Sequence, residues 1–403
     1  MIKKVIFFVL LFMFIYVSTF NIFMTGIFRI PAPIVFLAPL FIFYRNDNGS
    51  FDYGYEAIIF FIASFLYTLI GEQDTTSFFA FIIVISCYII FFNYVIGNNI
   101  KRLKLTIFIF FSLLFLSGLI MLIDHQIDIS AIRSFFAGSP IIQSPSGISL
   151  TLFNFGYQMA ALTSFMFVST IVFKRNWVLG LVLIVFALCF IFFGMQRSTL
   201  VAFVVTSFIF IITYYKAKSF LFFSVIAVLL FIGQNYVDLF SSEKNQKNIL
   251  NKNVQNTNQN EGRENLIIEN LKVIVDYPFG LIFYNKSWNE VVKHNHVYKK
   301  GPVIITSHNA YLMFITYLGP LLGLLMLLML YYKIFQIIWN AFKEIKLLEN
   351  AMLICLSCSF LAVSINSIFH NEWLLITSGP THILYFSLLQ LSKINKNNLI
   401  QIY

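Results

Sequence analysis

A single arginine interrupts the apolar stretch FFGMQRSTLVAFVV, which runs from Phe192 to Val205. No aspartate or glutamate occurs between Asp128 and Asp238, so Arg197 has no carboxylate nearby in the sequence to neutralise it. An unpaired charge at the middle of a bilayer costs at least about 2.5–3.5 kcal/mol, so we expect this arginine near the membrane surface or facing a cavity. Two interpretations are open: an arginine that snorkels from a helix end, or a residue that binds an anion.

Two further arginines belong to the same question. Arg133 has no acid after Asp128 in its own segment, whereas Arg263 has Glu261 and Glu264 beside it. For Arg263 an ordinary surface ion pair is the simplest interpretation. Guanidinium groups match phosphate oxygens in a bidentate manner. Taken together, the three arginines indicate an anionic ligand reached from the membrane, and a lipid-linked pyrophosphate is one candidate.

A histidine lies where another helix is expected to begin, in TSHNAYLMFITYLGPLLGLLMLL from Thr306 to Leu328. Ser307 is expected to cap this helix, which would place His308 and Asn309 in its first turn. At a helix end above the bilayer, a histidine can act as a general base or orient a substrate hydroxyl. The alternative is that His308 only marks the water boundary.

Other polar clusters are weaker candidates for chemistry. Glu72 and Asp74 in GEQDTT could hold a divalent ion, but a solvated turn is the simpler interpretation. His294 and His296 lie in a loop with lysines on both sides, which disfavours a metal site there. We therefore expect no metal site in this protein.

The elements that position these residues belong to a membrane protein. The 403 residues are 59% hydrophobic and 11% charged, with a mean hydropathy of +0.83, whereas soluble domains carry about 25% charged residues. Apolar runs long enough to cross about 30 Å of hydrocarbon recur, and in lipid each must be a helix. We expect an all-α, polytopic membrane protein with about twelve transmembrane helices. The expected spans are 5–25, 30–44, 57–71, 78–96, 105–123, 150–173, 177–194, 198–215, 219–237, 308–332, 351–369 and 373–391.

Lysines and arginines are distributed unevenly between the two sides of these spans. With the N-terminus inside, the inner loops hold fifteen of the 27 basic residues and the short outer loops hold three. Because basic loops remain in the cytoplasm, both termini are expected there. The net charge of +10 is explained by this topology and does not indicate a nucleic-acid partner.

Two outer segments are long enough to contribute to a site. The first, about 124–149, contains turn-forming residues and Arg133. The second, 238–307, includes GRENLIIENLKVIVDYPFG, which has the pattern of an amphipathic helix at the outer membrane–water interface. Pro278 and Gly280 are expected to end this helix. Its expected apolar face consists of Leu266, Ile267, Leu271, Ile274 and Val275.

The chain therefore divides into three parts. A transmembrane region of about nine helices covers 1–237, a long outer loop covers 238–307, and a transmembrane region of about three helices covers 308–403. These parts leave no room for a soluble catalytic domain, so any chemistry must be built from helix ends and the two outer segments.

Three segments, in this order, resemble the O-antigen polymerase (Wzy-type) and O-antigen ligase superfamily. GMQRSTLVAF opens a helix with an arginine followed by hydroxyl residues, and GRENLIIENLKVIVDYPFG starts an amphipathic helix with Gly-Arg and ends in Pro-x-Gly. SHNAYLMFITYLGPLLGLLML has His-Asn followed by glycines ten and more positions later. The resemblance covers roughly 190–330, and the N-terminal half is similar only in being polytopic. One departure is YPFGLIFYNK, which has one glycine where many members show a second soon after.

The resemblance implies a metal-independent, inverting glycosyl transfer at the periplasmic face of the bacterial inner membrane, with no cofactor. The donor would be a glycan on undecaprenyl pyrophosphate, and the long loop would be periplasmic. Arg197 and Arg263 would bind the pyrophosphate and stabilise it as leaving group. His308 would activate or position the acceptor hydroxyl, with Asn309 binding substrate beside it. Arg133 joins the substrate-binding set on its residue type and expected location alone.

Three functions are compared on these grounds. The expected one is a repeat-unit polymerase for O-antigen or capsular polysaccharide, with a chain-length regulator and a flippase of the same pathway as partners. The second is a ligase that transfers glycan to lipid A-core. The third, from another class, is a lipid-linked oligosaccharide flippase, which would need a cationic cavity deep between helices. Apart from His382, for which a neutral, hydrogen-bonded packing role is expected, no ionisable residue lies in the middle of a span.

Overall fold

The computed structural model describes residues 2–22, 31–46, 50–69, 75–174, 176–220, 263–300, 303–371, 374–375 and 379–400. Helices dominate this part of the chain, with one short antiparallel pair of strands, β1 (Lys299–Lys300) and β2 (Val303–Ile304). Seven of the described helices are long and apolar enough to cross a membrane, and three shorter apolar helices accompany them. The seven are Ile2–Thr19, Thr76–Ile96, Ile100–Asp124, Leu152–Val172, Arg197–Lys218, Ala310–Lys343 and Leu348–Phe369. The protein is therefore an all-α, multi-pass membrane protein.

The structure does not establish the expected count of twelve spans. The shorter helices correspond to three expected spans and are α2 (Ala32–Tyr44), α3 (Gly54–Leu69) and α8 (Trp177–Phe193). The span expected at 219–237 lies almost entirely outside the described residues. The last helix, α17 (Gly379–Ile400), begins later than expected, at the Gly-Pro pair of residues 379 and 380, because proline is favoured in a first helical turn.

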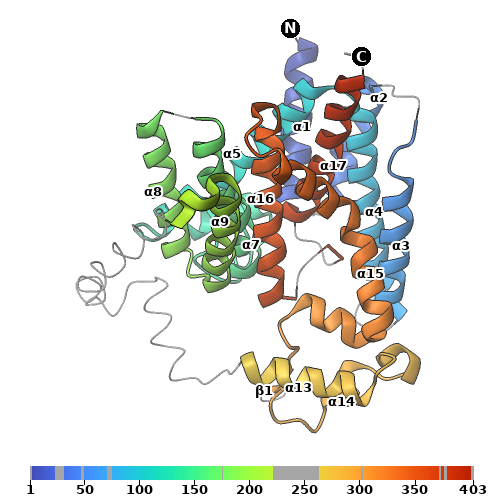
Figure 1. Ribbon diagram of the computed structural model, residues 1–403. Coiled ribbons are helices and arrows are strands. Elements are labelled where there is room, and N and C mark those ends of the chain that lie inside the picture. The colour runs from blue at the N-terminus through green and yellow to red at the C-terminus, as the bar shows by residue number, and fades with distance from the viewer. Residues whose placement is uncertain are drawn as a thin grey trace, which may run out of the picture. The chain divides into compact units, whose positions relative to one another are not determined.

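One of two compact units is formed by Met1–Leu113, Gly262–Ile337 and Ser367–Tyr403. In this unit α1 (Ile2–Thr19) packs on α2 and α17, and α4 (Thr75–Ile90) packs on α3 and α17. Further helices complete the unit (Figure 1). They are the first half of α5 (Ile100–Asp124), α13 (Arg263–Asp276), α14 (Trp288–Val292) and most of α15 (Ala310–Lys343).

Polar side chains tie α17 and α15 to the start of α3. The pairs are Glu56 with Lys333, Tyr53 with Gln390, and Asp52 with Lys393. His382 is buried on α17, and its Nε2 lies 2.8 Å from the carbonyl oxygen of Leu374. The hydrogen-bonded packing role expected for this histidine is thus confirmed.

The second unit is formed by Leu114–Glu261 and Ile338–Asn366. Its central helix is α7 (Leu152–Val172), which packs on α8, on α9 (Arg197–Tyr215) and on α16 (Ala351–Asn366). Alanines 160, 202 and 362 gather where α7, α9 and α16 meet. Small side chains at such contacts let membrane helices approach closely, and this close packing holds α9 against α7 and α16.

The face that α13 buries against the protein is centred on a polar residue, Asn270. Leu266, Asn270 and Val273 are buried, whereas Leu271 and Val275, which belong to the expected apolar face, are exposed. The buried face contacts α15, where a threonine hydroxyl bonds to the asparagine side chain. Because a buried amide needs a hydrogen-bond partner, the helix turns its asparagine inward and two aliphatic residues outward.

A contact between two glycines follows the end of α13. Pro278 and Gly280 come directly after this helix, as expected, and the backbone of Gly280 lies against that of Gly319 in α15. Both glycines have positive φ, +91° and +79°, and a Cβ on Gly280 would lie 2.6 Å from the carbonyl oxygen of Tyr317, so no larger residue fits. Gly319 also interrupts α15, and Pro320 begins its second part. Figure 1 shows this change of direction at the lower end of α15.

Candidate functional site

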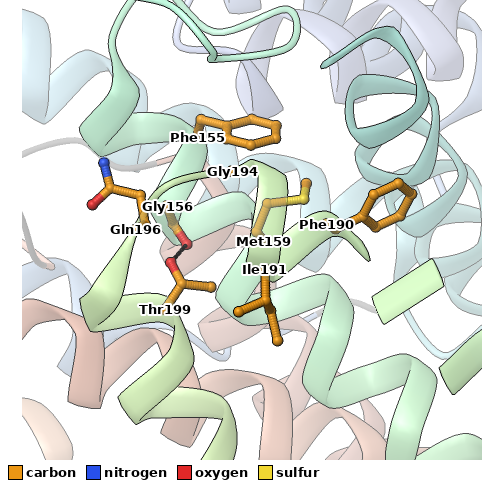
Figure 2. A pocket seen from close by; sticks show the side chains of 8 residues that line it. All are labelled: Phe155, Gly156, Met159, Phe190, Ile191, Gly194, Gln196 and Thr199. Carbon is orange, nitrogen blue, oxygen red and sulfur yellow. Dashed lines mark hydrogen bonds between the residues drawn. The ribbon is translucent and has the colours of Figure 1, made fainter. Parts of the chain in front are cut away.

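Arg197 is the first residue of α9 and is exposed, while the polar residues around it are buried. Nε2 of Gln196 donates to the carbonyl of Leu152 at 3.1 Å, and the hydroxyl of Thr199 donates to the carbonyl of Gly156 at 3.1 Å (Figure 2). Both carbonyls lie in the first turns of α7. These bonds fix the turn that carries the exposed arginine at the N-terminus of a helix, where the helix dipole favours an anion.

A small pocket lies behind this turn, between α7, α8 and α9 (Figure 2). It has essentially no space for even a water molecule, whereas ligand pockets have volumes of roughly 300–1,000 Å³. Its lining consists of Phe155, Gly156, Met159, Phe190, Ile191, Gly194, Gln196 and Thr199. The mostly apolar lining and the small volume mark a packing gap beneath the turn, so the pocket does not provide a sugar site.

Arg133 has an acidic partner that the sequence pattern did not reveal. It lies in α6 (Ser130–Ala137), is 1% exposed, and forms an ion pair with Asp124 at the end of α5. Its Nε donates to the carbonyl of Gly147 at 2.7 Å, and its Nη2 donates to the hydroxyl of Ser146 at 2.6 Å. The expectation that Arg133 lacks a local counter-ion is therefore wrong, because the chain folds back onto an acid that precedes the arginine.

These contacts make Arg133 the centre of the folded segment 124–149. Burial of the guanidinium lowers the pKa of Arg133, and the nearby Asp124 carboxylate offsets only part of this effect. His125, next to Asp124 in the sequence, contacts the end of α8, because its Nε2 lies 3.0 Å from the carbonyl oxygen of Phe193. Arg133 and Arg197 thus lie at the same end of their unit, where α5 and α8 end and α7 and α9 begin.

In the other unit, α13 and the first part of α15 run in the same direction. Asn270 bonds to side chains in the first two turns of α15, and farther along both segments Gly280 meets Gly319. Because the two contacts advance in the same sense, the N-termini of the two helices lie at the same end. α13 begins at Arg263, and α15 begins at Ala310, two residues after His308. The structure therefore places the N-terminal ends of α13 and α15, where these two predicted site residues occur, at one end of a helix pair.

His308 precedes α15 and does not lie in its first turn. Oδ1 of Asn309 accepts the N–H of Leu312 at 3.0 Å, so Asn309 is the N-cap and the cap expected at Ser307 is wrong. The backbone of His308 has a φ of +52°, and its N–H bonds to the hydroxyl of Thr306 at 3.4 Å. Backbone strain of this kind is rare outside glycine and concentrates at functional sites.

The turn after α16 supports the His308 segment. The N–H of Ala310 donates to the carbonyl of His370 at 2.9 Å, and Nδ2 of Asn371 donates to the hydroxyl of Thr306 at 2.6 Å. His370 is itself buried. The histidine segment is therefore held between its own helix and a second stretch of chain, and this support maintains its positive φ.

The described residues contain no group of three or more His, Cys, Asp or Glu side chains that could hold a metal ion. Glu72 and Asp74, the weak metal candidates, lie outside the described residues. The groups that the described site offers are guanidinium and imidazole side chains beside helix N-termini, and these groups favour an anionic ligand.

Asn270 is the residue of this region that the sequence interpretation missed. It is a polar residue within LIIENLK, spaced one turn from Leu266 and from Val273. A lone amide at that spacing on an apolar face is a signal for a buried polar contact between helices.

Residues 182–328 match a protein family described as O-antigen ligase. The match covers the Arg197 turn, α13 and the segment from His308 to Gly319, which hold the predicted site residues Arg197, Arg263 and His308. A comparison with curated proteins gives no match. The family comprises membrane enzymes that transfer glycans, both O-antigen polymerases and O-antigen ligases. Residues 182–328 are thus similar to the O-antigen ligase family.

Proposed function

We propose that the protein is a repeat-unit polymerase for O-antigen or capsular polysaccharide. It transfers the growing glycan from undecaprenyl pyrophosphate onto an incoming repeat unit that is also linked to undecaprenyl pyrophosphate. The oxygen of the acceptor hydroxyl bonds to the anomeric carbon of the donor sugar and loses its proton. The bond between that carbon and the pyrophosphate breaks, and undecaprenyl pyrophosphate leaves with the bonding electrons.

The observation that carries this proposal is the placement of Arg263 and His308 at one end of a parallel helix pair. Arg263 binds the pyrophosphate, and the two helix N-termini add positive potential where negative charge develops on the leaving group. His308 accepts the proton of the acceptor hydroxyl or orients that hydroxyl. Asn309, which caps α15, contributes its amide group to substrate binding.

Arg197 is a second cation that we propose to bind the pyrophosphate. Its exposure at the start of α9, on a turn fixed by buried bonds, supports a role in binding pyrophosphate. Arg133 receives a different role from the one expected, because its Nε, Nη1 and Nη2 are all bonded within the protein. We assign it to the support of the segment 124–149.

The reaction takes place at the periplasmic face of the bacterial inner membrane, with both termini in the cytoplasm. The donor is already activated by its pyrophosphate, so neither a nucleotide nor a metal ion is needed in the proposed step. Both substrates are held in one leaflet by their lipid anchors, which restricts their motion to two dimensions and helps to orient them.

The ligase is the second candidate, because the matched family, described as O-antigen ligase, covers both polymerases and ligases. Deletion of the gene in a host with lipopolysaccharide, followed by gel analysis, separates the two functions. We expect lipid A-core capped with a single repeat unit and no ladder, because a polymerase is missing and the ligase of the host remains. Bare core, with long polymer still on undecaprenyl pyrophosphate, would show that the protein is a ligase. Complementation with the wild-type gene is the control.

A further inference from the structure

Asn270 is a polar side chain inside the mainly apolar contact between α13 and α15. It is 0% exposed. Its Oδ1 accepts the hydroxyl of Thr316, which also lies 2.8 Å from the carbonyl oxygen of Leu312, and its Nδ2 lies 3.2 Å from the sulfur of Met313. Leu266 and Val273, one turn to either side on α13, complete the buried face. The amide of Asn270 is thus surrounded by apolar groups, and its hydrogen-bond partners are side chains of α15.

A buried amide constrains helix packing more than an aliphatic side chain does. An apolar side chain at position 270 would tolerate small rotations and shifts of α13, because hydrophobic contact is not directional. Asn270 loses its hydrogen bonds on such a shift and then remains buried without partners, which is costly. Single buried asparagines set the register of coiled coils for the same reason. The contact therefore selects one rotation of α13 on α15.

The rotation of α13 determines where Arg263 is presented. Arg263 begins α13 two helical turns before Asn270, about 10 Å along the axis. At the other end, the backbone contact of Gly280 with Gly319 fixes the position of the chain along α15. The contact at Asn270 sets the rotation of α13 about its axis, and the contact between the glycines sets its position along α15. The N-terminal end of α13, which carries Arg263, therefore has one placement relative to His308.

We propose that Asn270, through its bond to Thr316, is a positioning residue for the glycosyl transfer. It fixes the rotation of α13 that presents Arg263 to the pyrophosphate beside His308. This inference rests on the proposed function, and it adds a residue that touches neither substrate nor the reacting atoms.

The test begins with Thr316→Val, which removes the hydroxyl and retains the branched shape. In proteoliposomes with a purified lipid-linked repeat unit, we expect turnover to fall by about tenfold to a hundredfold, the scale of a small misplacement of a catalytic group. Thr316→Ser retains the hydroxyl and should restore turnover to within about twofold. Thr106→Val is the matched control, because Thr106 is equally buried and its hydroxyl bonds to the carbonyl of Arg102 in its own helix.

A double substitution separates positioning from loss of stability. In an Arg263→Lys background, adding Thr316→Val should lower turnover by less than about twofold, because both changes disturb the same interaction with the pyrophosphate. Multiplicative losses at equal amounts of folded protein would overturn the inference. If Thr316→Val protein does not reach the membrane, Met313→Leu removes the other partner of Asn270 at similar volume. The same pattern is then expected, with a smaller loss of about threefold.

The outcomes also separate this inference from the function on which it rests. Wild-type turnover of Arg263→Lys and of Arg263→Ala would overturn the proposed function itself. Impaired Arg263 variants together with wild-type turnover of Thr316→Val, at normal protein level, would overturn only the positioning role of Asn270.

Discussion

Replacing Arg197 or Arg263 by alanine is expected to reduce glycan transfer by about a hundredfold to a thousandfold in each case, the loss seen when one preorganised charge-stabilising donor is removed. Negative charge builds up on the pyrophosphate as its bond to the sugar breaks, and both guanidinium groups are proposed to stabilise it. Lysine should restore little activity, since it offers a point charge in place of a planar fork. Transfer is measured in membranes with a lipid-linked repeat unit, at equal levels of inserted protein.

Arg45→Ala provides the matched control for these variants. Like Arg197, Arg45 is exposed, and its guanidinium lies over the rings of Phe41 and Tyr94. Its removal should leave transfer within about twofold of wild type. Wild-type polymer length from Arg197→Ala or from Arg263→Ala, at normal membrane level, would remove that arginine from the site.

His308→Ala is expected to lower turnover by about a hundredfold to ten-thousandfold, the usual contribution of a positioned general base. Binding of the donor should persist, because we propose that the arginines and the helix N-termini bind the pyrophosphate. Two measurements test this pair of expectations: turnover in reconstituted membranes, and binding of a lipid-pyrophosphate analogue to the purified protein.

His294→Ala is the control for the histidine, since His294 lies exposed in the loop between α14 and β1. It should behave as wild type in both measurements. Unchanged turnover of His308→Ala would return His308 to a residue that only marks the water boundary. A loss of donor binding equal to the loss of turnover would instead make it a binding residue.

Features that depend on local backbone chemistry were predictable from the sequence. The position of Arg197 at a helix end was predictable, because a few polar residues interrupt the apolar sequence there. The end of α13 just before Pro278 and Gly280 was predictable as well. Apolar length likewise predicted a multi-pass helical protein, because lipid permits no other arrangement of an isolated span. These signals need no knowledge of which helices meet.

Features that depend on a distant partner were not predictable. The acid that pairs with Arg133 precedes it and is brought back by a fold of the chain. Asn270 turns inward because a threonine of α15 bonds to it, and the need for glycine at position 319 becomes clear only when Gly280 is seen against it. The N-cap of α15 was not predictable for the same reason. Ser307 and Asn309 are both favourable cap residues, and the positive φ of His308 between them leaves Asn309 as the cap.

The central claim is that the protein breaks the bond between a glycan and undecaprenyl pyrophosphate while it forms a new glycosidic bond. The most direct measurement uses the purified protein in proteoliposomes with a purified lipid-linked repeat unit, without nucleotide and with EDTA present. We expect one undecaprenyl pyrophosphate to be released for each glycosidic bond formed, and products that lengthen by whole repeat units. Movement of intact lipid-linked units to the other leaflet, with no release of undecaprenyl pyrophosphate, would contradict this claim and identify a flippase.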